Sequence, residues 1–397
     1  MHLHFRLRRP HHWAATLLAG AAALAACGGG STPAADTEPA TIAAARPQAP
    51  ADAEPEGRRL FEHETFGGNG RTCLTCHTRE SGTVSPEDAQ ARLKANPDDP
   101  LFLADGSDDG AGHGATRMLE DATVLVRIAL PDNVSLASDP KARSVVLRRG
   151  IPSTLNTPAL DPVLMQDGRQ PDLQAQARGA IADHAHGTRE PTAQELDLIA
   201  SFQRTAPFFS SPELRAFALG GARPELPLGE TEAEKRGRRF FVDLPPNLPP
   251  AGDFKDGLCA GCHSGPILNE TNEFLPAPPF RRGGRFQSVA VSEFNSAGNP
   301  PIDFLFRNPD GSVTAVTSPD PGRALITGKA NDAESMNAFK IPTLWGVART
   351  APYFHDNSAR TLEDVARHYA RFFAAVSPIV LTQQDQDDMV AYMKKLR

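Results

Sequence analysis

Three stretches of the chain place apolar residues at helical spacing directly after a residue that can cap a helix. Thr192 and Glu195 form a capping box before the first stretch, and Thr361 and Thr382 precede the other two. The apolar positions are Leu196, Ile199 and Phe202 in the first stretch, Leu362, Val365, Tyr369 and Phe372 in the second, and Met389, Met393 and Leu396 in the third. Each stretch is therefore predicted to be a helix with one buried face.

Strand-like alternation of apolar and polar residues is scarcer. Residues 287–291 and 312–317 are the better candidates for strands. The 36 Pro and 32 Gly among 397 residues require long stretches of loop. The pattern as a whole predicts a mostly α-helical protein with long loops.

The N-terminal segment predicts export. Residues 1–26 have a basic start and then an apolar run that is too short to span a bilayer, as in a signal peptide. Cys27 follows Leu-Ala-Ala as in a lipoprotein lipobox, which predicts a lipid anchor; an ordinary secretory signal is the alternative. Residues 27–56 are predicted to be a flexible tether. Gly28 offers no retention acid, so we expect a periplasmic protein whose anchor lies preferably in the outer membrane.

Four of the five cysteines form two C-x-x-C-H motifs. The motifs are Cys73-Leu-Thr-Cys76-His77 and Cys259-Ala-Gly-Cys262-His263. Two thiols at this spacing can each form a thioether with one haem vinyl group, and the adjacent imidazole then reaches the iron. A redox dithiol would need a βαβ setting, and a zinc site would need a second Cys pair nearby. The sequence therefore predicts two covalently bound haem c groups, with His77 and His263 as iron ligands.

A similar segment precedes each motif. Gly57-Arg-Arg-Leu-Phe61 stands before the first motif and Gly237-Arg-Arg-Phe-Phe241 before the second. We expect each segment to be a helix ahead of the loop that presents the haem site, as in small cytochrome c domains. This repetition predicts two tandem cytochrome c-like domains, residues 57–210 and 211–397.

Two longer segments carry a family resemblance. The segment 339–356, FKIPTLWGVARTAPYFHD, resembles the signature of bacterial dihaem cytochrome c peroxidases and MauG-type proteins. The segment 151–169, IPSTLNTPALDPVLMQDGR, is similar to a second motif of the same family. The resemblance covers about residues 57–397, with both haem motifs in the expected order.

The resemblance implies different roles for the two haems. The C-terminal haem, on His263, would be the entry site for electrons, and the N-terminal haem, on His77, would be where peroxide is cleaved. Met336 matches the axial Met of the peroxidases, and Tyr353 matches the axial Tyr of MauG-type proteins. We favour Met336, because it lies in a polar loop where a thioether has no packing role. Gln176 matches a family Gln on the distal side of the N-terminal haem.

The chain departs from the family at three positions. The family's distal Glu is His186 here, the Trp between the haems is Gln166, and the Asn associated with an interdomain calcium is Ile151, which makes calcium doubtful. Peroxide cleavage needs a group that moves a proton between two oxygens, which an imidazole can do near neutral pH. His186 or its neighbour His184 is therefore a candidate acid/base. Equally, either could bind the iron, or both could lie on the surface; His113 is a further distal candidate.

Three functional hypotheses follow. A peroxidase-like oxidoreductase that reduces hydrogen peroxide ranks first, and a non-catalytic periplasmic electron-transfer cytochrome ranks second. A MauG-like oxidase or oxygenase of an organic substrate ranks third. The net charge of −7 argues against nucleic acid as a partner and suits a basic electron donor, either a small redox protein or a quinol-linked protein. The family is often dimeric, so a homodimer is expected as well.

Overall fold

The computed structural model describes residues 53–156, 158, 160–242, 255–272, 283–295 and 298–397. All of them belong to one compact unit, residues 47–397. The predicted signal peptide, Cys27 and the tether up to residue 52 lie outside the described residues and stay predictions. The last residues assigned to the tether, 53–56, already belong to a helix. Where the structure is described, no helix has the length and apolar character to cross a membrane.

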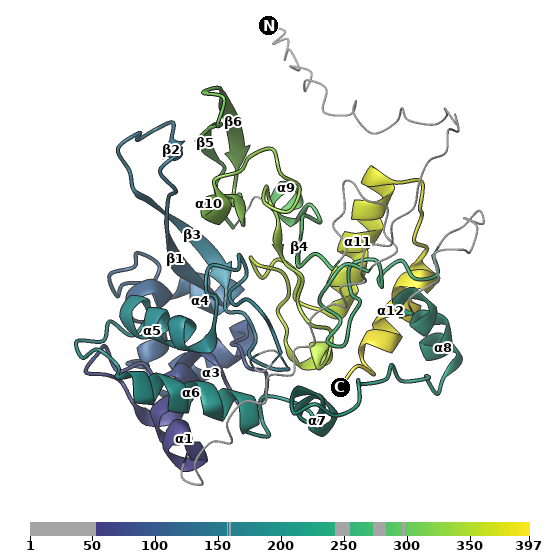
Figure 1. Cartoon of the computed structure of the whole chain (residues 1–397), viewed down its shortest axis with the longest axis horizontal. Helices are drawn as coiled ribbons and strands as arrows, with labels where there is room; N and C mark the ends of the chain where they lie inside the picture. Colours follow the sequence, from purple (N-terminus) through teal and green to yellow (C-terminus); the bar gives the residue numbers. More distant parts are fainter. Residues whose placement is uncertain (1–52, 157, 159, 243–254, 273–282, 296–297) are drawn as a thin grey trace, which may run out of the picture. The chain divides into compact units, whose positions relative to one another are not determined.

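Within the described ranges the chain forms twelve α-helices and seven short strands (Figure 1). The helices are α1 (Ala53–His63), α2 (Cys73–Cys76), α3 (Pro86–Ala95), α4 (Thr116–Asp121), α5 (Leu173–Asp183), α6 (Ala193–Thr205), α7 (Pro212–Ala218), α8 (Glu232–Arg238), α9 (Val291–Phe294), α10 (Ala324–Thr327), α11 (Leu362–Val376) and α12 (Gln383–Met393). The strands are β1 (Thr123–Ala129), β2 (Val134–Leu136), β3 (Ser144–Gly150), β4 (Phe286–Gln287), β5 (Ile302–Arg307), β6 (Val313–Ser318) and β7 (Phe339–Lys340).

The three helices predicted from apolar periodicity are confirmed. Thr192, Thr361 and Thr382 are the N-caps of α6, α11 and α12, and each closes a capping box. In each box the threonine hydroxyl accepts the backbone N–H of the third helical residue, whose carboxylate accepts the threonine N–H in return. These reciprocal bonds satisfy amides that the first turn leaves without partners, which is why the helices begin where they do.

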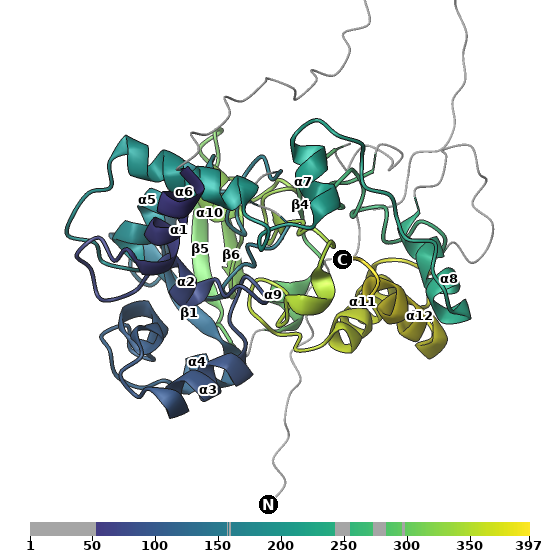
Figure 2. The same cartoon turned by 90° about the horizontal axis from the view of Figure 1, so that it is seen from below.

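Two helix pairs have the same construction. Helix α1 packs on α6, and α8 packs on α12, as both views show (Figures 1 and 2). Gly57 of α1 lies against the Leu198 carbonyl, and Gly237 of α8 lies against the Asp388 carbonyl. A Cβ atom at either glycine would overlap that carbonyl oxygen, so only glycine allows the two backbones to approach this closely. The repeated Gly-Arg-Arg segment thus marks the same helix–helix contact in each half.

The strands are more extensive than the sequence analysis indicated. The missed strands β1 and β3 form an antiparallel hairpin, with Thr123 opposite Gly150 and Ala129 opposite Ser144. Strand β2 lies between β1 and β3 in the sequence, but it belongs to a second sheet of order β2-β5-β6 (Figure 1). The alternation is present along β1, where buried Val126 and exposed Arg127 are neighbours.

Of the two strands that were predicted, one is confirmed. Residues 312–317 correspond to β6. Residues 287–291 were predicted wrongly, since only Gln287 of that range lies in β4. The strand cannot continue because Ala290 adopts a left-handed conformation, with φ of +59°, and α9 begins at the next residue.

Candidate haem sites

The first C-x-x-C-H motif folds as a single helical turn followed by its histidine. Helix α2 contains both cysteines, and His77 is its C-cap residue. The His77 Nδ1 lies 2.9 Å from the Gly82 carbonyl oxygen, so this nitrogen donates and Nε2 keeps its lone pair. Burial lowers the pKa of His77, which favours the neutral imidazole that binds iron.

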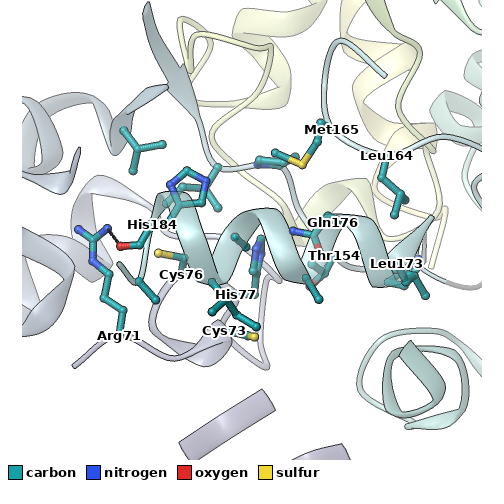
Figure 3. Close-up of a pocket in the computed structure, with 18 of the residues that line it drawn as sticks. Arg71, Cys73, Cys76, His77, Thr154, Leu164, Met165, Leu173, Gln176 and His184 are labelled. Atoms are coloured by element: carbon teal, nitrogen blue, oxygen red, sulfur yellow. Dashed lines mark hydrogen bonds between the residues drawn. The ribbon is translucent and has the colours of Figure 1, made fainter. Parts of the chain in front are cut away.

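A cavity opens directly over this turn. The cavity has an empty volume of about 1360 Å³, which includes the part that is open to solvent. The lining includes Cys73, Cys76, His77, Gln166, Gln176 and His184, together with apolar residues such as Ile151, Leu164, Leu173 and Ile181. Figure 3 shows Gln176 and His184 of this lining together with Cys73, Cys76 and His77 of the motif.

Both thiols of the first motif line the cavity. Both are free, and burial raises the pKa of Cys73 to about 12 and raises that of Cys76 as well. Redox-active and metal-bound cysteines have lowered pKa values, because the thiolate is their reactive form. An apolar cavity with two thiols and an available imidazole Nε2 therefore fits a haem c.

His184 reaches the cavity with a buried ion pair behind it. Its Nδ1 bonds to Asp105 Oδ2, and the other Asp105 oxygen accepts from the Arg71 guanidinium. The Arg71 side chain is only 3% exposed, and its nitrogens donate to backbone oxygens, including that of Pro100 at 2.8 Å and that of Leu101 at 2.9 Å. Arg71 Nη1 also donates a hydrogen bond of 3.2 Å to the backbone oxygen of His184 (Figure 3).

Asp105 is ionised in this arrangement. Burial alone would raise the pKa of Asp105, but His184 and Arg71 bring it below its usual value. A carboxylate on Nδ1 fixes the tautomer of His184 and leaves Nε2 as the free ring nitrogen. Sequence reasoning missed Asp105 and Arg71, because they are 34 positions apart and only the fold brings them together.

The other histidines proposed for the distal side lie elsewhere. His186 is exposed and is not among the residues that line the cavity. Its φ of +52° places it in a left-handed turn two residues beyond His184, the C-cap residue of α5. His113 is 83% exposed and pairs with Asp109 at 2.7 Å on its own loop.

The second motif repeats the histidine contact of the first. His263 Nδ1 lies 2.9 Å from the Leu268 carbonyl oxygen, and burial lowers the pKa of His263. Cys259 packs against an apolar cluster that includes Leu344, Leu362, Met389 and Met393. Burial raises the pKa of Cys262 to about 11. The two thiols and the imidazole therefore repeat the donor set that fits a haem c at the first motif.

The two candidates for the remaining axial ligand of the C-terminal haem lie in different clusters. Tyr353 packs against the same apolar cluster as Cys259, and its hydroxyl donates to the Val347 carbonyl at 2.9 Å. Met336 packs instead against a different apolar cluster, which includes Leu147, Phe304 and Leu325 and against which Cys76 also packs. Tyr353 thus shares an apolar cluster with the second motif, and the choice of axial ligand between Met336 and Tyr353 stays a prediction.

The comparisons with known proteins agree with the two motifs. No family model matches the chain. It is 33% identical over 144 residues to cytochrome c peroxidase Ccp of Escherichia coli, which covers 36% of this chain and 23% of that one. It is 26% identical over 231 residues to cytochrome c551 peroxidase of Nitrosomonas europaea, which covers 55% of this chain and 58% of that one. The chain thus spans less than two thirds of either relative.

Among solved structures, one example is similar over most of this chain. It is a MauG-like protein associated with microbial copper homeostasis, with 20% identity, a TM-score of 0.49, and coverage of 89% of this chain and 91% of that one. The sequence matches to two peroxidases agree with the paired C-x-x-C-H motifs and with the signature segment 339–356. The two peroxidase matches, together with the paired motifs, support the chain as a divergent relative of the bacterial dihaem cytochrome c peroxidases.

Proposed function

We propose that this chain is an exported dihaem c-type cytochrome that accepts electrons at the C-terminal haem and reduces hydrogen peroxide at the N-terminal haem. The observation that carries the proposal is the Arg71–Asp105–His184 array, which faces the cavity of the first C-x-x-C-H motif. The relatives named cytochrome c peroxidase and cytochrome c551 peroxidase support the same chemistry. A lipid anchor at Cys27, a periplasmic location and a small redox or quinol-linked donor complete the proposal.

The reaction needs protons as well as electrons. Hydrogen peroxide takes up two electrons and two protons and leaves as two waters. Bound haem would supply the iron at which the O–O bond is cleaved. The His184 Nε2 would take a proton from one peroxide oxygen and return it to the other, while Asp105 holds the ring by Nδ1. Gln176, whose amide lines the same cavity, would donate a hydrogen bond to the bound peroxide.

An electron-transfer function is the second candidate, and the same array favours it. A carboxylate behind Nδ1 is also the usual support for an imidazole that binds a metal. His184 would then complete the coordination of the N-terminal iron and close it to peroxide.

Spectroscopy of the purified protein separates the two functions. The protein should carry two covalently bound haems per chain, measured by intact mass and by the pyridine haemochrome spectrum. EPR and optical spectra of the half-reduced protein should show an open or exchangeable N-terminal iron that responds to peroxide. Two low-spin haems that ignore peroxide and cyanide at every redox level would leave only the electron-transfer function.

Substitution of the two axial candidates tests the second site. Tyr353→Phe should change the optical spectrum or the potential of the C-terminal haem, because the candidate oxygen is lost. This assignment requires the bond from Tyr353 to the Val347 carbonyl to be replaced by one to iron. Met336→Leu should leave both properties unchanged, since Met336 packs against a different apolar cluster from Cys259 and Tyr353. A sulfur-to-iron band that disappears in Met336→Leu would restore the methionine assignment.

A further inference from the structure

The end of strand β3 carries an arginine that is almost completely enclosed. The Arg149 side chain is 1% exposed, and it bonds to Asp320 through Nε at 2.7 Å and Nη2 at 2.9 Å. Its Nη1 donates to Asp167 at 2.6 Å. Asp167 also accepts from Arg169, with both oxygens 2.9 Å from Nη1. The cluster therefore contains two guanidinium groups and two carboxylates with no net charge.

Arg149 and Asp167 depend on the neighbouring members of this cluster for their charge. Burial alone would lower the pKa of Arg149, but Asp320 and Asp167 raise it above its usual value. Burial alone would raise the pKa of Asp167, but Arg149 and Arg169 bring it below its usual value. Removal of one member would leave an uncompensated charge in the interior, which is strongly destabilising.

The cluster joins the wall of the first cavity to the segment that carries Tyr353. Arg149 and Gly150 both line the cavity. The Arg149 guanidinium lies 5.6 Å from the centre of the Phe339 ring, and that ring stacks on His355 at 3.6 Å. The Gly150 N–H donates to the His355 carbonyl at 2.8 Å. These contacts attach residues 339–357 to the strand that borders the N-terminal haem site.

The side-chain amide of Asn357 fills the space beside Gly150, the residue after Arg149. A Cβ atom at position 150 would overlap the side-chain oxygen of Asn357, so glycine is required where that amide lies. The Asn357 Nδ2 donates to the backbone oxygens of Asp121 and Ala122, each at 2.9 Å. Asn357, the residue directly after the signature segment, thus connects that segment to the end of α4 through its side chain.

The residues at this junction do not fit a calcium ion. Ile151, at the position of the family's calcium-associated Asn, has no side-chain oxygen and is 8% exposed within an apolar cluster. Its carbonyl oxygen accepts from Thr83 Oγ1 at 2.6 Å. A hard cation needs six or more oxygens directed at it, whereas the carboxylates here are directed at a guanidinium. We propose that Arg149 is a permanent internal cation that locks the first cavity wall to residues 339–357, in a junction that needs no divalent metal ion.

The haem-loaded wild-type protein tests metal independence directly. Thermal unfolding should give the same Tm after dialysis against EDTA and after addition of millimolar CaCl₂, with unchanged optical spectra of both haems. A Tm that falls with EDTA and returns with calcium would overturn the proposal.

Substitution of the arginine gives the converse result. Arg149→Ala removes the guanidinium and leaves Asp167 and Asp320 facing a vacated space, so its Tm should fall by roughly 5–10 °C. Millimolar CaCl₂ should raise the Tm of this variant by several degrees, because two carboxylates then face a site that a cation can enter. Arg149→Ala with Asp320→Asn should lose that response. An Arg149→Ala protein as stable as wild type would contradict the role of the internal cation.

A milder variant keeps the test valid if Arg149→Ala does not fold. Arg149→Lys keeps the positive charge but cannot bond to both Asp320 oxygens and Asp167 in one plane. Its Tm should lie below that of the wild type, still without a response to calcium. A calcium response in Arg149→Lys would show that the charge at this position does not exclude metal.

Discussion

Replacement of His184 by Ala is expected to slow the reaction of the N-terminal haem with hydrogen peroxide by roughly 10²–10³-fold, within the range of general acid–base catalysis. The reason is geometric. His184 lines the cavity above the first motif, and Asp105 occupies its Nδ1, so the remaining ring nitrogen is available to a ligand in the cavity. Stopped-flow absorbance of the half-reduced protein after peroxide addition measures the rate.

His186→Ala is the matched control, because it removes the same side chain two positions away. His186 is exposed and lies outside the cavity lining, so the rate should stay within about twofold of wild type. If the control loses activity and His184→Ala does not, the acid/base assignment returns to His186. If His184→Ala instead converts a low-spin resting haem to a high-spin one, His184 is an iron ligand and the electron-transfer function gains support.

Asp105→Asn tests whether the negative charge of Asp105, and not only its size, supports the function of His184. The amide keeps the size of the side chain but loses the negative charge between His184 and Arg71. A carboxylate that holds a functional imidazole by its second ring nitrogen contributes roughly 10–100-fold to activity, so the peroxide rate should fall by that factor. The same stopped-flow assay applies, with the optical spectra as a control for haem incorporation. A rate equal to that of the wild type would show that Asp105 only stabilises the loop.

The local parts of the fold were predictable because their causes are local. A capping box places Thr192 three positions from Glu195, and both partners of that contact can be recognised in the sequence. The close helix–helix contacts at Gly57 and Gly237 could also be recognised in the sequence, since the Gly-Arg-Arg segment occurs twice. The alternation in β1 was present as well, but a hairpin interrupted by β2 lacks the short turn that usually marks one.

The candidate site was predictable only in part, because its other residues meet through tertiary structure. The sequence indicated an imidazole near the end of α5, yet a left-handed residue at 186 decides which of two histidines faces the cavity. Asp105 and Arg71 carry no motif, and their pairing depends on a loop that folds around a guanidinium. The apolar clusters against which Met336 and Tyr353 pack likewise depend on tertiary structure.

The double substitution Cys259→Ala and Cys262→Ala should remove the C-terminal haem and abolish steady-state peroxide reduction. Without both thiols no thioether can form, so the intact mass should fall by one haem. Turnover with ascorbate and a mediator, or with a small basic cytochrome, should fall to background, because the proposed entry site for electrons is missing. Sustained turnover would show that the donor reaches the N-terminal haem directly.

The mirror variant, Cys73→Ala with Cys76→Ala, makes this test specific. It should lose the N-terminal haem and all peroxide reduction, yet its remaining haem should still be reduced by the donor at the wild-type rate. The two variants lose the same number of thiols from the same kind of partly buried turn, so a general folding defect would affect both in the same way. Both variants should lose peroxide turnover, but only the variant that keeps the C-terminal haem should still oxidise the donor. That combination requires the two haem sites to act in series.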